Sequence, residues 1–274
     1  MTVKKETEIV KNWPTNSPPM VSINCFSYNQ EKYISNAIEG FLIQETNFPF
    51  EIIIHDDAST DKTPEIIREY EKQYSKIIKP IYQTENQYSK RKYSIWADLT
   101  FPLALGKYIA LCEGDDYWTD PNKLQKQVEL LEANPKCSLC FHNSLIIFAD
   151  KSKADSYFCI DLKDNQVFKT KDLILANWFV PTASILLKRS NLVNYPDWWK
   201  AVFNGDLLLQ LLVSLNGNLI YIDEVMAVYR KNVQGSLSSI ERNPTFFLRA
   251  RISASESYMF KPSIRIFPSI LTSS

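Results

Sequence analysis

Glycine is scarce in this sequence. There are 6 glycines in 274 residues, whereas an average composition of about 7% would give roughly 19. Their spacing spells neither a GxGxxG nor a GxxxxGK loop, the two common glycine-rich phosphate-binding sequences. If the protein binds a phosphorylated ligand, a group other than a glycine-rich loop must neutralise the phosphates.

The chain also lacks an excess of charge of either sign, because 31 Lys and Arg residues balance 31 Asp and Glu residues. A chain without net charge has no overall field that attracts a polyanion, so nucleic acid is not an expected partner. Hydrophobic residues make up 45% of the chain and charged residues 23%, which is typical of a folded protein rather than a disordered one.

Long hydrophobic runs are absent as well. No stretch reaches the roughly 18 apolar residues that a membrane-spanning helix needs. The first 19 residues contain three prolines and no apolar core of signal-peptide length. Cys137 and Cys140 form a CxxC without a second pair, so we interpret the five cysteines as buried thiols. These features predict a reduced, cytoplasmic protein.

Strand and helix patterns alternate through the first 118 residues. Apolar runs rich in β-branched residues predict four strands, at Val21–Tyr28, Phe50–His55, Ile77–Tyr82 and Tyr108–Cys112. The segments between them have helical periodicity, and one such helix is expected over Tyr93–Leu105, closed by Gly106. This alternation predicts an α/β fold with a Rossmann-like, mostly parallel sheet and helices on both faces.

The second half has a mixed pattern. Strands are expected at Leu139–Phe148, Ala183–Leu187 and Leu219–Ile222, and a helix near Asp206–Leu215. No internal repeat and no low-complexity linker separates the two halves. We therefore expect the second half to pack directly against the first sheet.

Two of the predicted strands end in acidic clusters. Asp56 and Asp57 follow the second strand, and Glu113, Asp115 and Asp116 follow the fourth. Ligands of open α/β sheets bind beyond the carboxyl ends of the strands. Carboxylates that share one crevice repel one another unless a cation or hydrogen-bond donors are present. Solvated helix caps are the alternative interpretation, but a hard divalent ion held by one or two carboxylates and a diphosphate would satisfy both requirements.

Three segments carry a resemblance to a known family: VSINCFSYN at 21–29, EIIIHDDASTD at 51–61 and GKYIALCEGDDYW at 106–118. In order and spacing they resemble the family 2 glycosyltransferases of GT-A fold, and the resemblance extends over Met20–Pro135. It implies an inverting enzyme that moves a sugar from a nucleotide-diphosphate donor, a UDP-sugar, to a hydroxyl of a glycan or lipid-linked acceptor. Surface polysaccharide synthesis is the role that the family most often implies.

The resemblance also implies donor-binding residues. Tyr28 would stack on the nucleotide base with Ser27 beside it, and Asp57 would bind the edge of the base. Arg91, in the basic segment that precedes the expected third helix, could reach the diphosphate, although a solvated basic loop explains it equally well.

A divalent ion, Mn²⁺ or Mg²⁺, is implied at the second acidic cluster. Asp116 would hold the ion, and Asp115 would contact the ribose or the metal. Glu113 stands where the family usually has the first aspartate of this motif, so it could ligate the ion or line the pocket. Many members have a histidine after a late Tyr-Arg pair, whereas Asn232 follows Tyr229–Lys231 here, which leaves a metal ligand from that side open.

Sugar transfer also needs a general base that takes the proton of the acceptor hydroxyl. Asp206 opens an apolar helix at a position that resembles the family's catalytic acid, so we predict that it is this base. An ordinary helix N-cap is the alternative interpretation of Asp206. Five aromatic and hydroxyl residues lie where the family builds its acceptor floor, and buried packing explains them as well: Trp178, Thr182, Ser184, Trp198 and Trp199.

The residue pattern and the resemblance together divide the chain into four parts. Residues 1–19 form an N-terminal arm, 20–118 a nucleotide-sugar-binding half, and 119–239 the acceptor-binding and catalytic half of the same domain. Residues 240–274 form a basic and aromatic tail, which could contact an anionic membrane from the cytoplasmic side or cap the domain.

Three other functions are alternative interpretations of the sequence. A nucleotidyltransferase on a related fold would need a glycine-rich, basic segment near the first strand, and Phe26–Asn29 offers none. A phospho-receiver module would have its acidic pair after the first strand, and its chain would be about half as long as this one. A third alternative is a relative that binds nucleotide sugars without turnover, because Glu113 and Asn232 depart from the residues that the family usually has at these positions.

Overall fold

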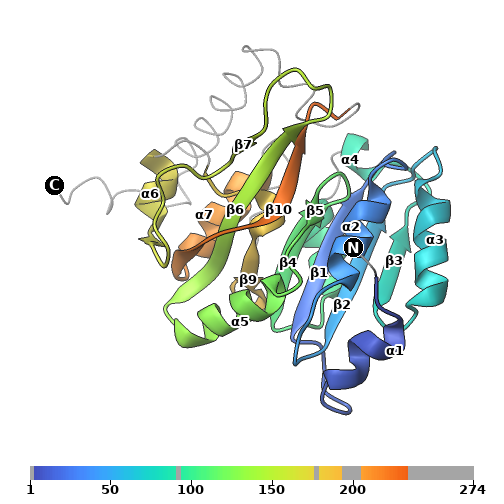
Figure 1. The fold of residues 1–274 in the computed structure, drawn as a ribbon, viewed down its shortest axis with the longest axis horizontal. Helices are drawn as coiled ribbons and strands as arrows, with labels where there is room; N and C mark the ends of the chain where they lie inside the picture. Colours follow the sequence, from blue (N-terminus) through green and yellow to red (C-terminus); the bar gives the residue numbers. More distant parts are fainter. Residues whose placement is uncertain (1–2, 91–93, 176–178, 193–204, 234–274) are drawn as a thin grey trace.

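The computed structural model describes residues 3–90, 94–175, 179–192 and 205–233. Within these ranges a single 10-stranded sheet runs through both halves of the chain (Figure 1). Its main path is β3 (Ile78–Tyr82), β2 (Phe50–Asp56), β1 (Val21–Ser27), β4 (Tyr108–Glu113), β9 (Leu186–Lys188), β6 (Cys137–Phe148), β10 (Asn218–Lys231) and β5 (Tyr117–Trp118). Two short strands, β7 (Ser156–Tyr157) and β8 (Val167–Phe168), pair with β6 and β10.

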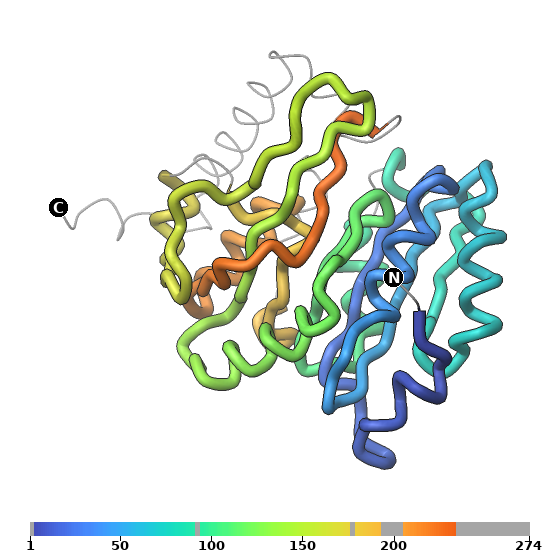
Figure 2. The backbone as a smooth tube through the Cα atoms, viewed as in Figure 1, coloured from blue at the N-terminus to red at the C-terminus, as the bar shows by residue number. Residues whose placement is uncertain are grey.

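The first four strands of the sheet are parallel. β1 pairs in parallel with β2 and with β4, and β2 pairs in parallel with β3. β9 lies antiparallel between β4 and β6, and β10 is parallel to β6. The predicted α/β fold with a mostly parallel sheet is therefore confirmed. In the backbone trace of Figure 2 the two halves lie side by side, and the sheet joins them through the pairing of β4 with β9.

Alternate residues of the strands fill two hydrophobic cores, one on each face of the sheet. In β2, Ile52 and Ile54 belong to one core and Ile53 to the other, as the two-residue period of a strand requires. Helices α2 (Ile34–Leu42), α3 (Thr63–Gln73) and α5 (Lys123–Ala133) pack on the first face, and α6 (Thr170–Leu175) and α7 (Gly205–Ser214) on the second. Figure 1 shows α2 in front of the sheet and α7 behind it. None of the helices in the described ranges is long and apolar enough to cross a bilayer.

Two sequence-based expectations need correction. The regular helix expected over Tyr93–Leu105 is instead a π-helical turn at Ile95–Thr100 followed by a 3₁₀ turn at Phe101–Leu103. Pro102 lacks an N–H and its ring clashes with the carbonyl one turn earlier, so an α-helix cannot continue through it. The strand expected at Leu219–Ile222 extends to Lys231, because β10 resumes pairing with β6 after a bulge that begins at Ile222.

Several other expectations fall outside the described residues. These are the diphosphate contact of Arg91, the aromatic acceptor residues Trp178, Trp198 and Trp199, and the membrane contact of the tail at 240–274. They remain predictions from the sequence.

A lysine lies in the core beneath β5. The side chain of Lys123 is fully buried, its Nζ donates to Gln127 Oε1 at 2.6 Å, and it lies 3.8 Å from the centre of the Trp118 ring. Trp118 and Gln127 in turn donate to the carbonyls of Ala183 and Ser184, at 2.8 Å each. The cluster therefore fixes the turn at Thr182–Ser184 against α5. Burial lowers the pKa of Lys123 to about 7.

This pKa predicts a pH dependence of stability. Folded Lys123 loses its proton near pH 7, whereas the same lysine in the unfolded chain keeps it up to about 10.5. Between these values the unfolded chain binds more protons, so the free energy of unfolding rises with pH. We expect Lys123→Met to remove up to about 2 kcal/mol of this rise between pH 7 and pH 9, measured by urea unfolding at both pH values.

The matched control is Lys126→Met on the same helix. Lys126 is partly exposed and pairs with Asp120 and Glu224, which raise its pKa although burial opposes them. It stays protonated in both states up to pH 9, so this variant should keep the wild-type pH slope. Equal slopes for Lys123→Met and the wild type would show that Lys123 is charged in the core.

Candidate active site

The acidic residues predicted from the sequence gather at one edge of the sheet. In the parallel ladders Ser27 is level with Asp56, and Phe26 is level with Glu113. The carboxyl ends of β1, β2 and β4 therefore finish side by side, with Asp57 and the turn Asp115–Asp116 immediately beyond them. This is the edge at which open α/β sheets bind ligands.

Asp57 is fully buried and organises the segment after β3. Its Oδ1 accepts from the main-chain N–H of Gln87 at 2.8 Å, and its Oδ2 accepts from that of Tyr88 at 3.0 Å. Each carboxylate oxygen can accept a second hydrogen bond, so Asp57 keeps capacity for a ligand donor. Ser27 is buried beside it with an unpaired Oγ, and Tyr28 is 40% exposed. The arrangement is compatible with the nucleotide-binding roles predicted for these three residues.

The loops after β1 and β2 are tied together by Asp61. Its carboxylate accepts from the main-chain N–H groups of Glu31 and Thr63, at 3.0 Å each. Burial raises the pKa of Asp61, but these hydrogen bonds outweigh burial and hold the pKa below its ordinary value. Asn29 and Ala58 adopt left-handed backbone with φ of 51° and 61° in the same two loops. Asp61 thus has a structural role: it joins the two loops and accepts from the first residue of α3.

The turn after β4 buries carboxylates with few donors around them. Asp115 and Asp116 are 6% and 1% exposed. Oδ1 of Asp116 accepts from the main-chain N–H of Arg230 at 2.8 Å, whereas its buried Oδ2 has no hydrogen-bond partner. Burial raises the pKa of Asp115 to about 6, and the nearby charge of Arg230 opposes that shift.

The second half of the chain brings a further carboxylate to this edge. Asp206 lies in the first turn of α7, where its Oδ2 accepts from Thr182 Oγ1 at 2.7 Å. Burial raises the pKa of Asp206. Burial also raises the pKa values of Glu113 and Asp116, and the charge of Asp206 raises both further. The general base predicted from the sequence therefore lies close enough to the acidic turn to share its electrostatic environment.

The carboxylate oxygens around Asp116 fit a divalent ion whose coordination is completed by a second ligand. Among the described residues, no three His, Cys, Asp or Glu side chains are arranged as a ready-made metal site. The buried, unpaired Oδ2 of Asp116 is nevertheless an oxygen that needs a cation or a donor. Mg²⁺ in particular is usually bound by one or two carboxylates together with substrate phosphates. Asp116 would hold such an ion, with Glu113 and Asp115 next to it.

The side-chain amide of Asn232 binds the loop after β6. Its Nδ2 donates to both carboxylate oxygens of Asp150, at 3.2 and 3.1 Å, and to Ser152 Oγ at 3.2 Å. The side chain thus ties the end of β10 to the loop after β6.

The sequence did not predict the contacts that two residues make in this site. Arg230 bonds to the acidic turn, but its strand was expected to end at Ile222. Thr182 was noted only as a candidate acceptor residue, and its bond to Asp206 depends on a contact between distant segments. The Tyr-Arg pair before Asn232 was the available signal for Arg230.

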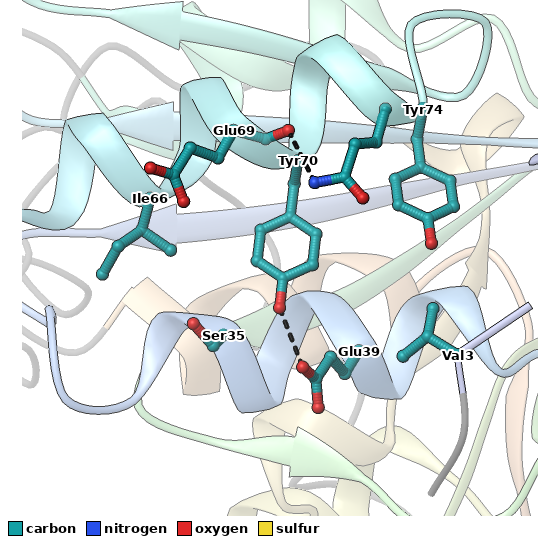
Figure 3. Close-up of a pocket in the computed structure, with 8 residues that line it drawn as sticks. Val3, Ser35, Glu39, Ile66, Glu69, Tyr70 and Tyr74 are labelled. Atoms are coloured by element: carbon teal, nitrogen blue, oxygen red, sulfur yellow. Dashed lines mark hydrogen bonds between the residues drawn. The ribbon is translucent and has the colours of Figure 1, made fainter. Parts of the chain in front are cut away.

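A separate hollow lies between α2 and α3 (Figure 3). It has a volume of about 440 Å³ and is lined by Val3, Ser35, Glu39, Ile66, Glu69, Tyr70, Gln73 and Tyr74. The Tyr70 hydroxyl donates to Glu39 Oε1 across it at 2.8 Å. Burial and Glu39 raise the pKa of Tyr70 to about 12. None of the predicted site residues lines this hollow.

Comparison with known sequences identifies the family. The model of glycosyl transferase family 2 matches residues 22–174. An uncharacterized protein of Mycobacterium tuberculosis is 39% identical over 217 residues, which cover 78% of this chain and 60% of that protein. The Escherichia coli UDP-Glc:alpha-D-GlcNAc-diphosphoundecaprenol beta-1,3-glucosyltransferase WfaP is 35% identical over 113 residues, 41% of each chain. The chain belongs to glycosyl transferase family 2, and it spans about 60% of the length of its mycobacterial relatives.

Solved structures show the same fold. S. aureus TarS 1–349 in complex with UDP-GlcNAc matches with a TM-score of 0.65 and 17% identity, covering 86% of this chain and 66% of that one. The mannosyltransferase PcManGT from Pyrobaculum calidifontis, in complex with GDP-Man and Mn²⁺, matches with a TM-score of 0.61 and 17% identity, covering 89% and 66%. The GT-A fold predicted from the sequence is confirmed.

The unpaired oxygen of Asp116 leads to a prediction about cation binding. We expect Mn²⁺ to strengthen UDP binding by the wild type at least about tenfold, and Asp116→Asn to lose this gain. Without Mn²⁺, Asp116→Asn should have a melting temperature at least as high as that of the wild type. The amide removes a charge that burial disfavours, and its oxygen still accepts from the main-chain N–H of Arg230. Calorimetry with and without Mn²⁺, and thermal unfolding, measure the two effects.

Asp155→Asn is the control, since Asp155 is exposed and lies outside the site. It should keep the Mn²⁺ effect in full. A metal gain in Asp116→Asn equal to that of the wild type would remove Asp116 from the cation site.

Proposed function

We propose that the protein is an inverting glycosyltransferase that moves a sugar from a UDP-sugar to a hydroxyl of a glycan or lipid-linked acceptor in polysaccharide synthesis. The observation that carries the proposal is that the charge of Asp206, from the second half, acts on Glu113 and Asp116 at the acidic edge of the first half. One half then binds the donor and the other supplies the base. Structural neighbours bound to UDP-GlcNAc and to GDP-Man support a nucleotide-sugar donor.

The chain's own residues supply binding and proton transfer. Asp57 and Tyr28 would hold the nucleoside, and the acidic turn would bind the diphosphate through a divalent ion held by Asp116. The ion, Mn²⁺ or Mg²⁺, would act as a Lewis acid that neutralises the leaving diphosphate. The neighbour that contains Mn²⁺ supports this choice of cofactor.

Asp206 would act on the acceptor. It takes the proton of the acceptor hydroxyl while the hydroxyl oxygen bonds to the anomeric carbon and the bond from that carbon to the diphosphate breaks. The electron pair of the broken bond leaves with the nucleoside diphosphate. A single displacement of this kind inverts the anomeric centre. The raised pKa of Asp206 suits a base that works near neutral pH.

The acceptor class rests on the family and on one relative. The name of the E. coli relative describes an acceptor with a diphosphoundecaprenol lipid. For this activity we propose a cytoplasmic location. The protein would meet such an acceptor at the inner face of the membrane through residues 240–274.

Removing the carboxylate of Asp206 tests the proposed base. We expect Asp206→Asn to lower the rate of sugar transfer by about 10²–10⁴-fold, the usual contribution of a general base. Binding of UDP with Mn²⁺ should stay unchanged, because the amide still accepts from Thr182. A panel of UDP-sugars with product detection measures transfer, and calorimetry measures binding.

Asp172→Asn, in the first turn of α6, is the matched control and should transfer at the wild-type rate. Turnover by Asp206→Asn within about tenfold of the wild type would remove Asp206 from this role. A wild type that binds UDP-sugars and neither transfers nor hydrolyses them would support the non-catalytic alternative.

Thr182 allows a finer test. Its hydrogen bond lowers the pKa of Asp206, in opposition to burial. We expect Thr182→Val to raise this pKa and to move the acidic limb of the rate profile upward by about 0.7 pH unit, which equals about 1 kcal/mol. The measurement is the pH profile of transfer.

Ser184→Ala is the control in the same turn, because Ser184 Oγ donates to the carbonyl of Pro181. Its acidic limb should coincide with that of the wild type. If the limb of Thr182→Val also stays in place, Asp206 is not the group that titrates.

A further inference from the structure

Arg230 joins three separate parts of the chain behind the acidic turn. The residue is 9% exposed at the end of β10. Its Nη1 donates to the main-chain carbonyl of Asp115 at 2.5 Å, and its Nη2 donates to Asn36 Oδ1 on α2 at 2.9 Å. The guanidinium lies 4.4 Å from the ring centre of Tyr117 and 5.0 Å from that of Tyr33. Two hydrogen bonds and two aromatic faces therefore hold one cation in place.

The main chain of the same residue fixes the carboxylate of Asp116. The N–H of Arg230 donates to Oδ1 at 2.8 Å, which leaves Oδ2 as the oxygen without a partner. β10 also pairs with β5, where Val228 is level with Tyr117 directly after the acidic turn. Both ends of the turn are thus bound to β10, at Arg230 and at Val228.

We propose that Arg230 is a positioning residue for cation binding: it holds the turn Asp115–Asp116 so that Asp116 presents Oδ2 to a divalent ion. The inference rests on the proposed function, because it takes the acidic turn as the cation site. Arg230 touches no reacting atom in this role. It acts through the carbonyl of Asp115 and the carboxylate of Asp116.

The chemistry of the contacts requires arginine. A planar guanidinium can donate to Asp115 and Asn36 in different directions while its faces stack on two tyrosine rings. A lysine keeps the charge, but it is a point charge on a flexible stem and cannot reproduce this fixed fork. Charge alone should therefore restore only part of the function.

The test measures Mn²⁺ affinity directly. The paramagnetic signal of free Mn²⁺ is titrated with protein in the presence of saturating UDP, so the readout does not depend on catalysis. We expect Arg230→Met to weaken Mn²⁺ binding by about 10–100-fold, the usual effect of a residue that orients a metal ligand. Arg230→Lys should lie between Arg230→Met and the wild type.

A milder variant keeps the test independent of folding. Asn36→Ala removes one anchor of the guanidinium at an exposed helical position, where alanine favours the helix. It should weaken Mn²⁺ binding by about threefold or more without lowering the melting temperature. Arg68→Met is the matched control. Arg68 lies on α3, where its guanidinium carbon is 4.6 Å from the centre of the Tyr82 ring, and it does not contact the acidic turn.

The outcomes separate the two claims. Wild-type Mn²⁺ affinity in both Arg230→Met and Asn36→Ala would overturn the positioning role and leave the proposed function standing. A weakening in Arg230→Met that only matches its unfolded fraction, with no change in Asn36→Ala, would also overturn it. A wild type that binds no Mn²⁺ in the presence of UDP would contradict the metal-dependent function itself, and the inference with it.

Discussion

The burial of several carboxylates at one edge of a sheet is the constraint on which this structure depends. Burial and mutual repulsion raise the pKa values of Glu113 and Asp116, and the charge of Asp206 adds to both shifts. Such a cluster is unfavourable in a protein that only needs to fold. It becomes favourable when a cation and a diphosphate occupy the edge, because they supply the opposite charge. The cluster is therefore best explained by a ligand.

The fold explains how these groups meet. Parallel pairing of β1, β2 and β4 brings their carboxyl ends level, and the antiparallel β9 connects this half to the strands of the second half. The second half then contributes two residues with opposite effects. Asp206 adds negative charge for proton transfer, whereas Arg230 offsets part of the charge on Asp115 and Asp116. The buried cluster of Lys123, Trp118 and Gln127 supports the turn from which Thr182 reaches Asp206.

The sequence was most informative where local patterns determine structure. Continuous apolar runs located the parallel strands, and the acidic residues after them located the candidate site, because strand ends of a parallel sheet share one edge. The bonds of Arg230 and Thr182 could not be predicted, since they join segments far apart in the chain. Asp223 and Glu224 interrupt the apolar run of β10, so a local pattern ends the strand too early. The regular helix expected over Tyr93–Leu105 was wrong, because the apolar residues there have helical spacing but Pro102 interrupts an α-helix.

A crystal structure of the chain with UDP and Mn²⁺ tests the central claim most directly, because anomalous scattering from manganese locates the ion without reference to activity. The account predicts one strong peak beside Asp116 Oδ2, with the diphosphate on the far side of the ion and the uracil near Asp57 and Tyr28. Manganese bound away from the ends of β1, β2 and β4, or UDP bound without any ion at this edge, would contradict it.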